Sequence, residues 1–206
     1  MIAILIVLAL VVVIIVVIGL WAVTTYNGLI RLRNRVQEAW QQIDVELTRR
    51  HDLIPNLVET VKGYATHERE TLDAVVRARA AATAPGASVA QQAQSEGELS
   101  QALGRLMAIS EAYPDLKANQ NFLSLQSELS STEDRIAAGR RFYNANVREL
   151  NTKVETVPSN VIAGVGNIGR AEYFEVESQQ VRSAPQVNFG QNPPSSDRPL
   201  EPGAPS

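Results

Sequence analysis

The chain has 206 residues, a net charge of −3 and no cysteine. This length is enough for one soluble domain with a hydrophobic core. The slightly acidic balance gives no electrostatic support for nucleic-acid binding, and the lack of cysteine excludes disulfides, thiolate catalysis and cysteine-ligated metal sites.

The first predicted element is a transmembrane helix at the N-terminus. The run from Ile2 to Val23 has 22 residues, none of them charged, and 17 are Ile, Leu or Val. About 20 helical residues cross a hydrocarbon core of roughly 30 Å. A signal peptide would need a basic start and a small-residue cleavage site, and the run has neither. The core helix of a soluble protein would need a polar face, which the run also lacks. We therefore expect residues 1–25 to remain as an uncleaved anchor.

The flanks of this run predict its orientation. No basic residue precedes it, whereas Arg31, Arg33 and Arg35 follow it closely. Basic residues collect on the cytoplasmic side of a span, although a solvated helix face would also carry them. We expect a single-pass protein of the cell (inner) membrane, with the N-terminus outside and the helical domain in the cytoplasm.

An amphipathic helix is predicted directly after the anchor. Its apolar residues recur at intervals of three and four, at Leu29, Leu32, Val36, Trp40, Ile43 and Leu47. The mean step of 3.6 residues favours a packed bundle over an extended coiled coil. Only Gly28 interrupts the sequence between anchor and stripe, so we expect one nearly continuous helix.

The segment from Arg49 to Asn56 predicts a helix boundary. Two arginines suit a helix C-terminus, Asp52 suits an N-cap, and Pro55 is best tolerated in a first turn. A continuous helix with a kink is the alternative interpretation.

Three further helices follow in the predicted order. The second carries apolar residues from Ile54 to Val76 and ends at Thr83–Gly86. The third opens with Ser88 and Gln91 at capping-box spacing and ends at Tyr113-Pro114. The fourth is expected to run as one helix from near Asp115 to about Val157.

These elements predict an all-α protein: a single N-terminal transmembrane helix, then an antiparallel four-helix bundle over residues 26–176. The glycine-containing stretch 161–169 and the Tyr173-Phe174 pair are expected to lie against the bundle or a partner. Residues 177–206 contain six prolines and few apolar residues, and are predicted to be a disordered tail.

The sequence contains no recognisable reactive site. A di-iron bundle needs Glu-x-x-His, but Thr48 precedes His51 and Tyr64 precedes His67 at that spacing. The run Gly164–Gly169 fits a dinucleotide fingerprint in letters only, because no strand precedes it. We expect no catalytic, cofactor-binding or metal-binding residues and no small-molecule substrate, with both histidines solvated or capping.

Four polar residues lie close to the apolar stripe of the fourth helix. They are Glu133, Arg140, Asn144 and Asn151. A solvated flank is the expected role. The alternative is a buried network whose members satisfy one another and fix helix register.

Many short segments of the chain resemble one known family. The segments that carry the resemblance to the LemA family are Tyr26–Leu29, Leu32–Asn34, Ala39–Trp40, Ile43–Val45, Arg49–Arg50, Asp52–Leu57, Val61–Ala65, Glu133–Ala137, Tyr143–Asn144, Asn151–Thr152, Pro158–Asn160 and Tyr173–Glu175. Where the family often has Phe-Gly-Phe, this chain has Gly166-Asn167-Ile168. The resemblance implies a bacterial membrane protein with one N-terminal span, a four-helix soluble domain and no catalytic residues.

The leading functional hypothesis is a non-enzymatic scaffold, anchored in the lipid bilayer, that binds unidentified protein partners and itself. The candidate interaction or structural residues are Arg49, Arg50, Asp52, Pro55, Asn56, Tyr173 and Phe174. A signal relay or sensor component, using the helix between anchor and bundle, is the second hypothesis. An enzyme acting on membrane-associated substrates is the third.

Overall fold

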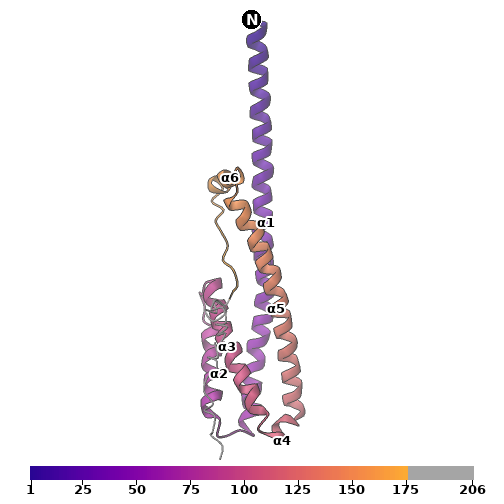
Figure 1. Cartoon of the computed structure of the whole chain (residues 1–206), viewed down its shortest axis with the longest axis vertical. Coiled ribbons are helices and arrows are strands. Elements are labelled where there is room, and N and C mark those ends of the chain that lie inside the picture. Colours follow the sequence, from indigo (N-terminus) through magenta and orange to yellow (C-terminus); the bar gives the residue numbers. More distant parts are fainter. Residues whose placement is uncertain (176–206) are drawn as a thin grey trace, which may run out of the picture. The chain divides into compact units, whose positions relative to one another are not determined.

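The computed structural model describes residues 1–175, and every regular element in that range is a helix (Figure 1). The helices are α1 (Ile2–Lys62), α2 (Arg69–Ala82), α3 (Val89–Ser110), α4 (Pro114–Lys117), α5 (Gln120–Glu155) and α6 (Ser159–Val165). The expectation of an all-helical chain is confirmed for these residues. The tail predicted at 177–206 lies outside the described residues.

Helix α1 joins the apolar N-terminal run to the first packed stripe without a break, as expected. It is long and apolar enough to cross a membrane. All the Ile, Leu and Val side chains before residue 24 are exposed, and the buried stripe begins at Leu29. The predicted domain boundary at residue 25 therefore falls inside one helix.

The predicted helix boundary between Arg49 and Asn56 is wrong, because α1 continues through Pro55 to Lys62. A proline has no N–H, so the carbonyl of His51, four residues earlier, loses its helical partner. Arg79 of α2 supplies the replacement, since its Nε donates to the His51 carbonyl oxygen at 2.8 Å. A side chain 28 residues away thus supports the helix at the position where the local sequence indicates an end.

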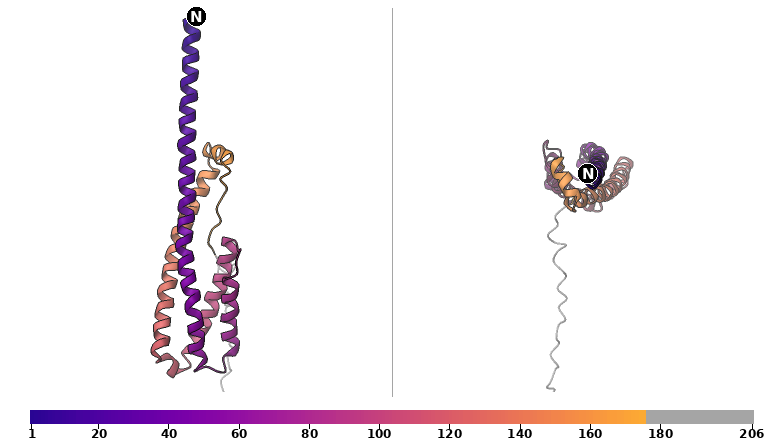
Figure 2. Two further views of the ribbon diagram at one scale, coloured as in Figure 1. Left: turned by 180° about the vertical axis from the view of Figure 1, so that it is seen from behind. Right: turned by 90° about the horizontal axis from the view of Figure 1, so that it is seen from above.

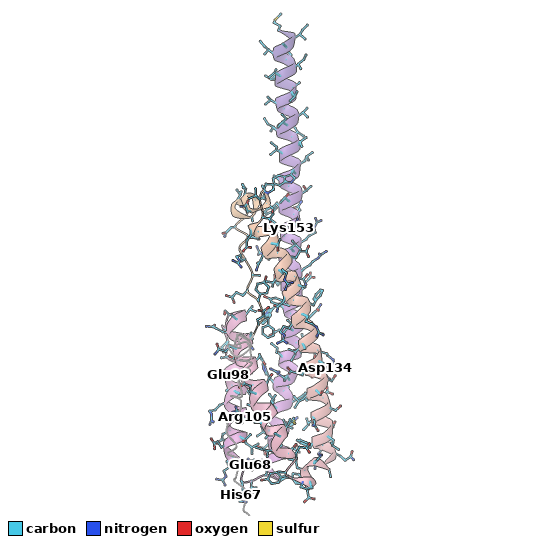
Figure 3. All side chains as sticks on the ribbon, viewed as in Figure 1. His67, Glu68, Glu98, Arg105, Asp134 and Lys153 are labelled. Carbon is cyan, nitrogen blue, oxygen red and sulfur yellow. The ribbon has the colours of Figure 1, made fainter. Side chains whose placement is uncertain are left out.

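Helices α2 and α3 form a hairpin that is packed mainly against itself. The predicted capping box at the start of α3 is confirmed, with Ser88 and Gln91 bonding reciprocally. The second helix begins later than expected, after a connection at residues 63–68. Figure 3 shows His67 and Glu68 in that connection, at the end of the bundle away from the N-terminus. There the Tyr113 hydroxyl donates to Glu68 Oε1 at 3.2 Å.

The predicted fourth helix is divided into α4 and α5. Asn119 lies between them and caps α5, its side chain accepting from the Phe122 N–H at 3.0 Å. Helix α5 then packs chiefly along α1. Gly139 of α5 lies against the Ile43 side chain of α1, since a Cβ at position 139 would be 3.0 Å from Ile43 Cγ1. A larger residue at this position would require the Ile43 side chain to shift.

Successive long helices run in opposite directions, so α5 returns alongside α1 towards the N-terminal segment (Figures 1 and 2). The buried apolar residues form two clusters. One surrounds the C-terminal end of α1 with α2, α3, α4 and the start of α5, from Ile54 to Leu129. The other lies between the middle of α1 and α5 and includes Ile168 and Phe174. The expected packing of residues 161–174 against the helices is confirmed for Ala163, Ile168 and Phe174, which are buried, whereas Val161 and Val165 are exposed.

We predict that Arg79→Ala lowers the free energy of unfolding by about 1–3 kcal/mol, because the His51 carbonyl is left without a donor. In a Pro55→Ala background the same substitution should matter much less, since an alanine at this position provides the missing helical N–H. Urea unfolding of the full chain in detergent, followed by Trp40 fluorescence on a Trp21→Phe background, measures both losses. Arg77→Ala, at an exposed site on α2, is the control. Equal losses in the two backgrounds would contradict this role of Arg79.

Candidate functional site

A layer of polar side chains separates the two apolar clusters, and it is the most unusual feature of the interior. Arg50 and His51 of α1 lie between the buried residues Leu47 and Ile54. On α3, Glu96 lies between Ala93 and Leu99, which belong to different clusters. We call Arg50, His51, Gln92, Glu96, Ser100 and Glu133 the polar layer.

Arg50 is the centre of this layer and is only 2% exposed. Its Nη2 bonds to Glu96 Oε2 of α3, while its Nη1 donates to Ser100 Oγ at 3.0 Å and to Glu133 Oε2 of α5 at 2.5 Å. A guanidinium presents donors in a fixed fork, so it can connect three helices at once. One side chain therefore ties α1 to both α3 and α5.

Glu96 completes the pairing from α3 and is itself 5% exposed. Its Oε1 accepts from His51 Nε2 and from Gln92 Nε2, both at 2.8 Å. Burial raises the pKa of this carboxyl, but the hydrogen bond from His51 and the charge of Arg50 together outweigh burial and hold its pKa below the usual value. Glu96 is therefore an anion, and His51 Nε2 must carry the proton in their shared bond.

Removing one partner from a buried ion pair leaves an unpaired charge, and this typically costs about 3–5 kcal/mol. If α3 slid along α1 by one turn, Glu96 would be displaced by about 5.4 Å and would lose its contact with Arg50. The layer therefore penalises other registers of the helices. Within residues 1–175 no group of three acidic or histidine side chains could hold a metal ion.

A second polar arrangement holds the chain after α6. Asn151 donates to the Ala171 carbonyl at 2.9 Å and accepts from the Ala171 N–H at 2.8 Å. Asn144 makes the same pair of bonds with Phe174, at 3.2 and 2.9 Å. Asn144 and Asn151 are seven residues apart on α5, a rise of about 10.5 Å. Ala171 and Phe174 are three residues apart, which is about 10 Å in an extended chain, so each asparagine meets its own residue. We call Asn144 and Asn151 the asparagine clamps.

An aromatic cluster lies next to these clamps. The Trp40 ring has its centroid 5.3 Å from that of Phe174, edge to face, and 5.5 Å from that of Tyr143. The Tyr143 hydroxyl donates to the Glu172 carbonyl at 2.8 Å. Burial, with a smaller contribution from the Glu172 charge, raises the pKa of Tyr143 to about 12. The phenol thus stays protonated and keeps donating across the neutral range.

The structure distributes the seven candidate residues over three environments. Arg50 is in the polar layer, and Tyr173 and Phe174 pack on the second apolar cluster. Asp52, Pro55 and Asn56 are exposed on α1, as is Arg49, which pairs with Glu128 of α5. Because α1 is continuous here, the segment is not a helix junction. Its role as a binding surface stays a prediction.

Comparisons with known proteins place the chain in a family. A sequence model of the LemA family matches residues 39–189. The chain belongs to the LemA family. The matched range contains the polar layer, the asparagine clamps and all seven candidate residues.

Several curated proteins are similar to this chain along much of its length. Protein LemA of Metamycoplasma hominis is 29% identical over 137 residues, which are 66% of this chain and 63% of that protein. Magnetosome protein MamQ 2 of Paramagnetospirillum magneticum is 27% identical over 175 residues, covering 73% and 64%. MamQ of Magnetospirillum gryphiswaldense is 26% identical over 174 residues, covering 72% and 64%. The chain thus spans less than two thirds of the length of these relatives.

Some residues of this LemA-family chain have roles that the sequence did not suggest. The expectation that His51 is solvated or capping is wrong, because it is buried against Glu96. The expected solvated flank is wrong for Asn144 and Asn151, which bond to main chain rather than to one another. Arg140 is exposed, as expected, and Glu133 is half exposed while it pairs with Arg50. One available signal was Arg50 itself, which continues the buried stripe one turn beyond Leu47.

We predict that Glu96→Ala lowers the free energy of unfolding by about 3–5 kcal/mol, since it leaves the buried Arg50 charge with only the half-exposed Glu133 as a carboxylate partner. Arg49→Ala is the matched control, because its pair with Glu128 is exposed and should be worth less than about 1 kcal/mol. Urea unfolding of the full chain in detergent gives both values. Similar small losses in the two variants would contradict a stabilising role for the layer.

The lowered pKa of Glu96 predicts a dependence of stability on pH. Unfolded, this carboxyl titrates near its ordinary value of 4.5, and folded it titrates lower, so the unfolded chain binds more protons in acid. The stability from Glu96 is complete above about pH 4.5 and falls as pH drops through the folded pKa. The difference in unfolding free energy between the native chain and Glu96→Gln should therefore shrink from about pH 6 to about pH 3. A difference that stays constant over this range would refute the assignment, with exposed Glu98→Gln as the control.

Proposed function

We propose that this protein is a single-pass, membrane-anchored helical scaffold without catalytic activity, which binds protein partners and copies of itself. In this proposal α1 anchors the chain through residues 2–23. The C-terminal half of α1 forms an antiparallel four-helix bundle with α2, α3 and α5. The bundle faces the cytoplasm, because Arg31, Arg33 and Arg35 follow the apolar run.

One observation carries the proposal. Asp52, Pro55 and Asn56 are exposed on a stretch of α1 whose opposite face is fixed by the polar layer. A polar surface on a rigid helix loses little conformational entropy when a partner binds. Such a surface suits recognition of a protein better than it suits chemistry on a small molecule.

The surroundings of His51 also favour binding over catalysis. Its Nε2 is already engaged by Glu96 inside the bundle, where it supports packing. A general base needs a nitrogen within reach of a substrate proton. In addition, two of the relatives are named after the magnetosome rather than after a reaction.

The experiment that tests the proposal is site-specific photocrosslinking in intact membranes. A benzoylphenylalanine at position 56 should give discrete adducts, identified by mass spectrometry, whereas the same group at exposed position 94 on α3 should not. Adding Asp52→Arg should remove the adducts by changing the charge of the surface. Only monomer from both positions, or the same adducts from both, would overturn the proposal.

A signal relay is the second candidate, and the continuity of α1 favours it. A helix that passes from the apolar run to the polar layer without a break can transmit a rotation. Inserting four residues near Gly28 rotates everything that follows. A passive tether should keep the adduct pattern from position 56 after this insertion, and a relay should lose it.

A further inference from the structure

Helix α6 and the turn before it present an apolar face that no other part of the described chain covers. Val157, Val161 and Val165 are 75%, 62% and 86% exposed, and they recur every four residues. The opposite side of α6 is packed, since Ala163 is buried and Ile162 rests on the second apolar cluster. The whole stretch from Thr156 to Gly169 is without charge. Leaving these valines in water is unfavourable, so the face calls for an apolar cover.

The position of α6 along α1 suggests what covers this face. The chain reverses at Gly166 directly against Tyr26, where a Cβ would lie only 2.7 Å from Tyr26 Cε2. Tyr26 follows the apolar run and precedes Arg31, the first charged side chain of the sequence. Figures 1 and 2 show α6 beside α1 at the end of the bundle nearest the N-terminal segment. The uncharged stretch that contains α6 therefore lies beside the uncharged part of α1.

The aromatic residues at the end of the apolar run indicate that the membrane surface lies at the same height along α1 as helix α6. Trp21 and Tyr26 are each about two fifths exposed, at 39% and 41%. Tryptophan and tyrosine are enriched where hydrocarbon gives way to headgroups. A short helix placed at that depth would have its outer face in the interfacial region, where exposed valines are favoured.

We propose that α6 is a second membrane contact, with Val157, Val161 and Val165 inserted into the interfacial region of the bilayer that α1 crosses. The proposal rests on the anchoring by α1 proposed above. Lipid fits better than a protein partner, because a stable interface buries about 800 Å² on each side and three valines cannot supply this. The bilayer around the exposed apolar part of α1 would already lie beside these valines, so no further partner is required to cover them.

The contact would restrain the bundle relative to the membrane. A single helix leaves the soluble part free to tilt, whereas a second point of insertion beside it limits that motion. Gly166 is then required for a close approach: a side chain there would press against Tyr26 and push α6 away from α1.

The test uses single cysteines, since the native chain has none. The full chain carrying Val161→Cys or Val165→Cys is labelled with NBD and reconstituted into vesicles of phosphatidylcholine and phosphatidylglycerol. Val45→Cys is the matched control, because it is an exposed valine on α1 about 28 Å beyond Tyr26 at about 1.5 Å per residue. Val13→Cys is near the middle of the span and reports insertion of the anchor through quenching by lipids with a deep nitroxide.

Lipids with a shallow nitroxide should quench the labels at 161 and 165 at least about twofold more than the label at 45, with blue-shifted emission. Quenching at 13 without quenching at 161 and 165 would overturn the proposal and leave the anchor intact. Blue-shifted labels at 161 and 165 that lipid nitroxides do not reach would also overturn it, in favour of a protein contact. No quenching at 13 would reject the anchor and the α6 contact together.

Discussion

The ion pair between Arg50 and Glu96 is the interaction on which the rest of the helical domain depends. It lies inside the protein, where a charge without a partner is strongly unfavourable, so the helices that carry the two residues must meet at one level. Because Glu133 and His51 attach to the same pair, α1, α3 and α5 are aligned by a single cluster. The apolar contacts above and below the layer are non-directional, so they discriminate less between registers than a buried charge pair does.

Beside this ion pair, one long helix joins the apolar N-terminal segment to the packed domain. Helix α1 has to pass Pro55 without a break, and Arg79 of α2 makes this possible by bonding to the His51 carbonyl beside the layer. At the other end, the asparagine clamps hold the chain after α6 against α5 as it runs back from Ala171 to Phe174. The domain thus has a fixed inner structure, a polar outer face on α1 and an apolar end near Tyr26. These three features support the scaffold function proposed above.

The sequence predicted the parts of this fold that depend on local patterns. Apolar spacing located the helices, and Ser88 with Gln91 predicted the start of α3. The errors occurred where distant residues decide the outcome. Pro55 indicates a helix end unless Arg79 is known to lie opposite it. Glu96 looks like an ordinary solvated glutamate among other polar residues of α3. Asn144 and Asn151 bond to main chain 30 and 20 residues away, which no local pattern reveals.

The most direct test of the polar layer is a distance measurement between helices. Spin labels at Val45→Cys on α1 and Gln94→Cys on α3 should give one narrow distance distribution in the native chain by pulsed electron resonance. Replacing the charged pair by Arg50→Met with Glu96→Leu should preserve folding but broaden the distribution or shift it by about one helical turn, roughly 5 Å. An equally narrow, unshifted distribution in the folded double variant would contradict the claim that the layer sets the register.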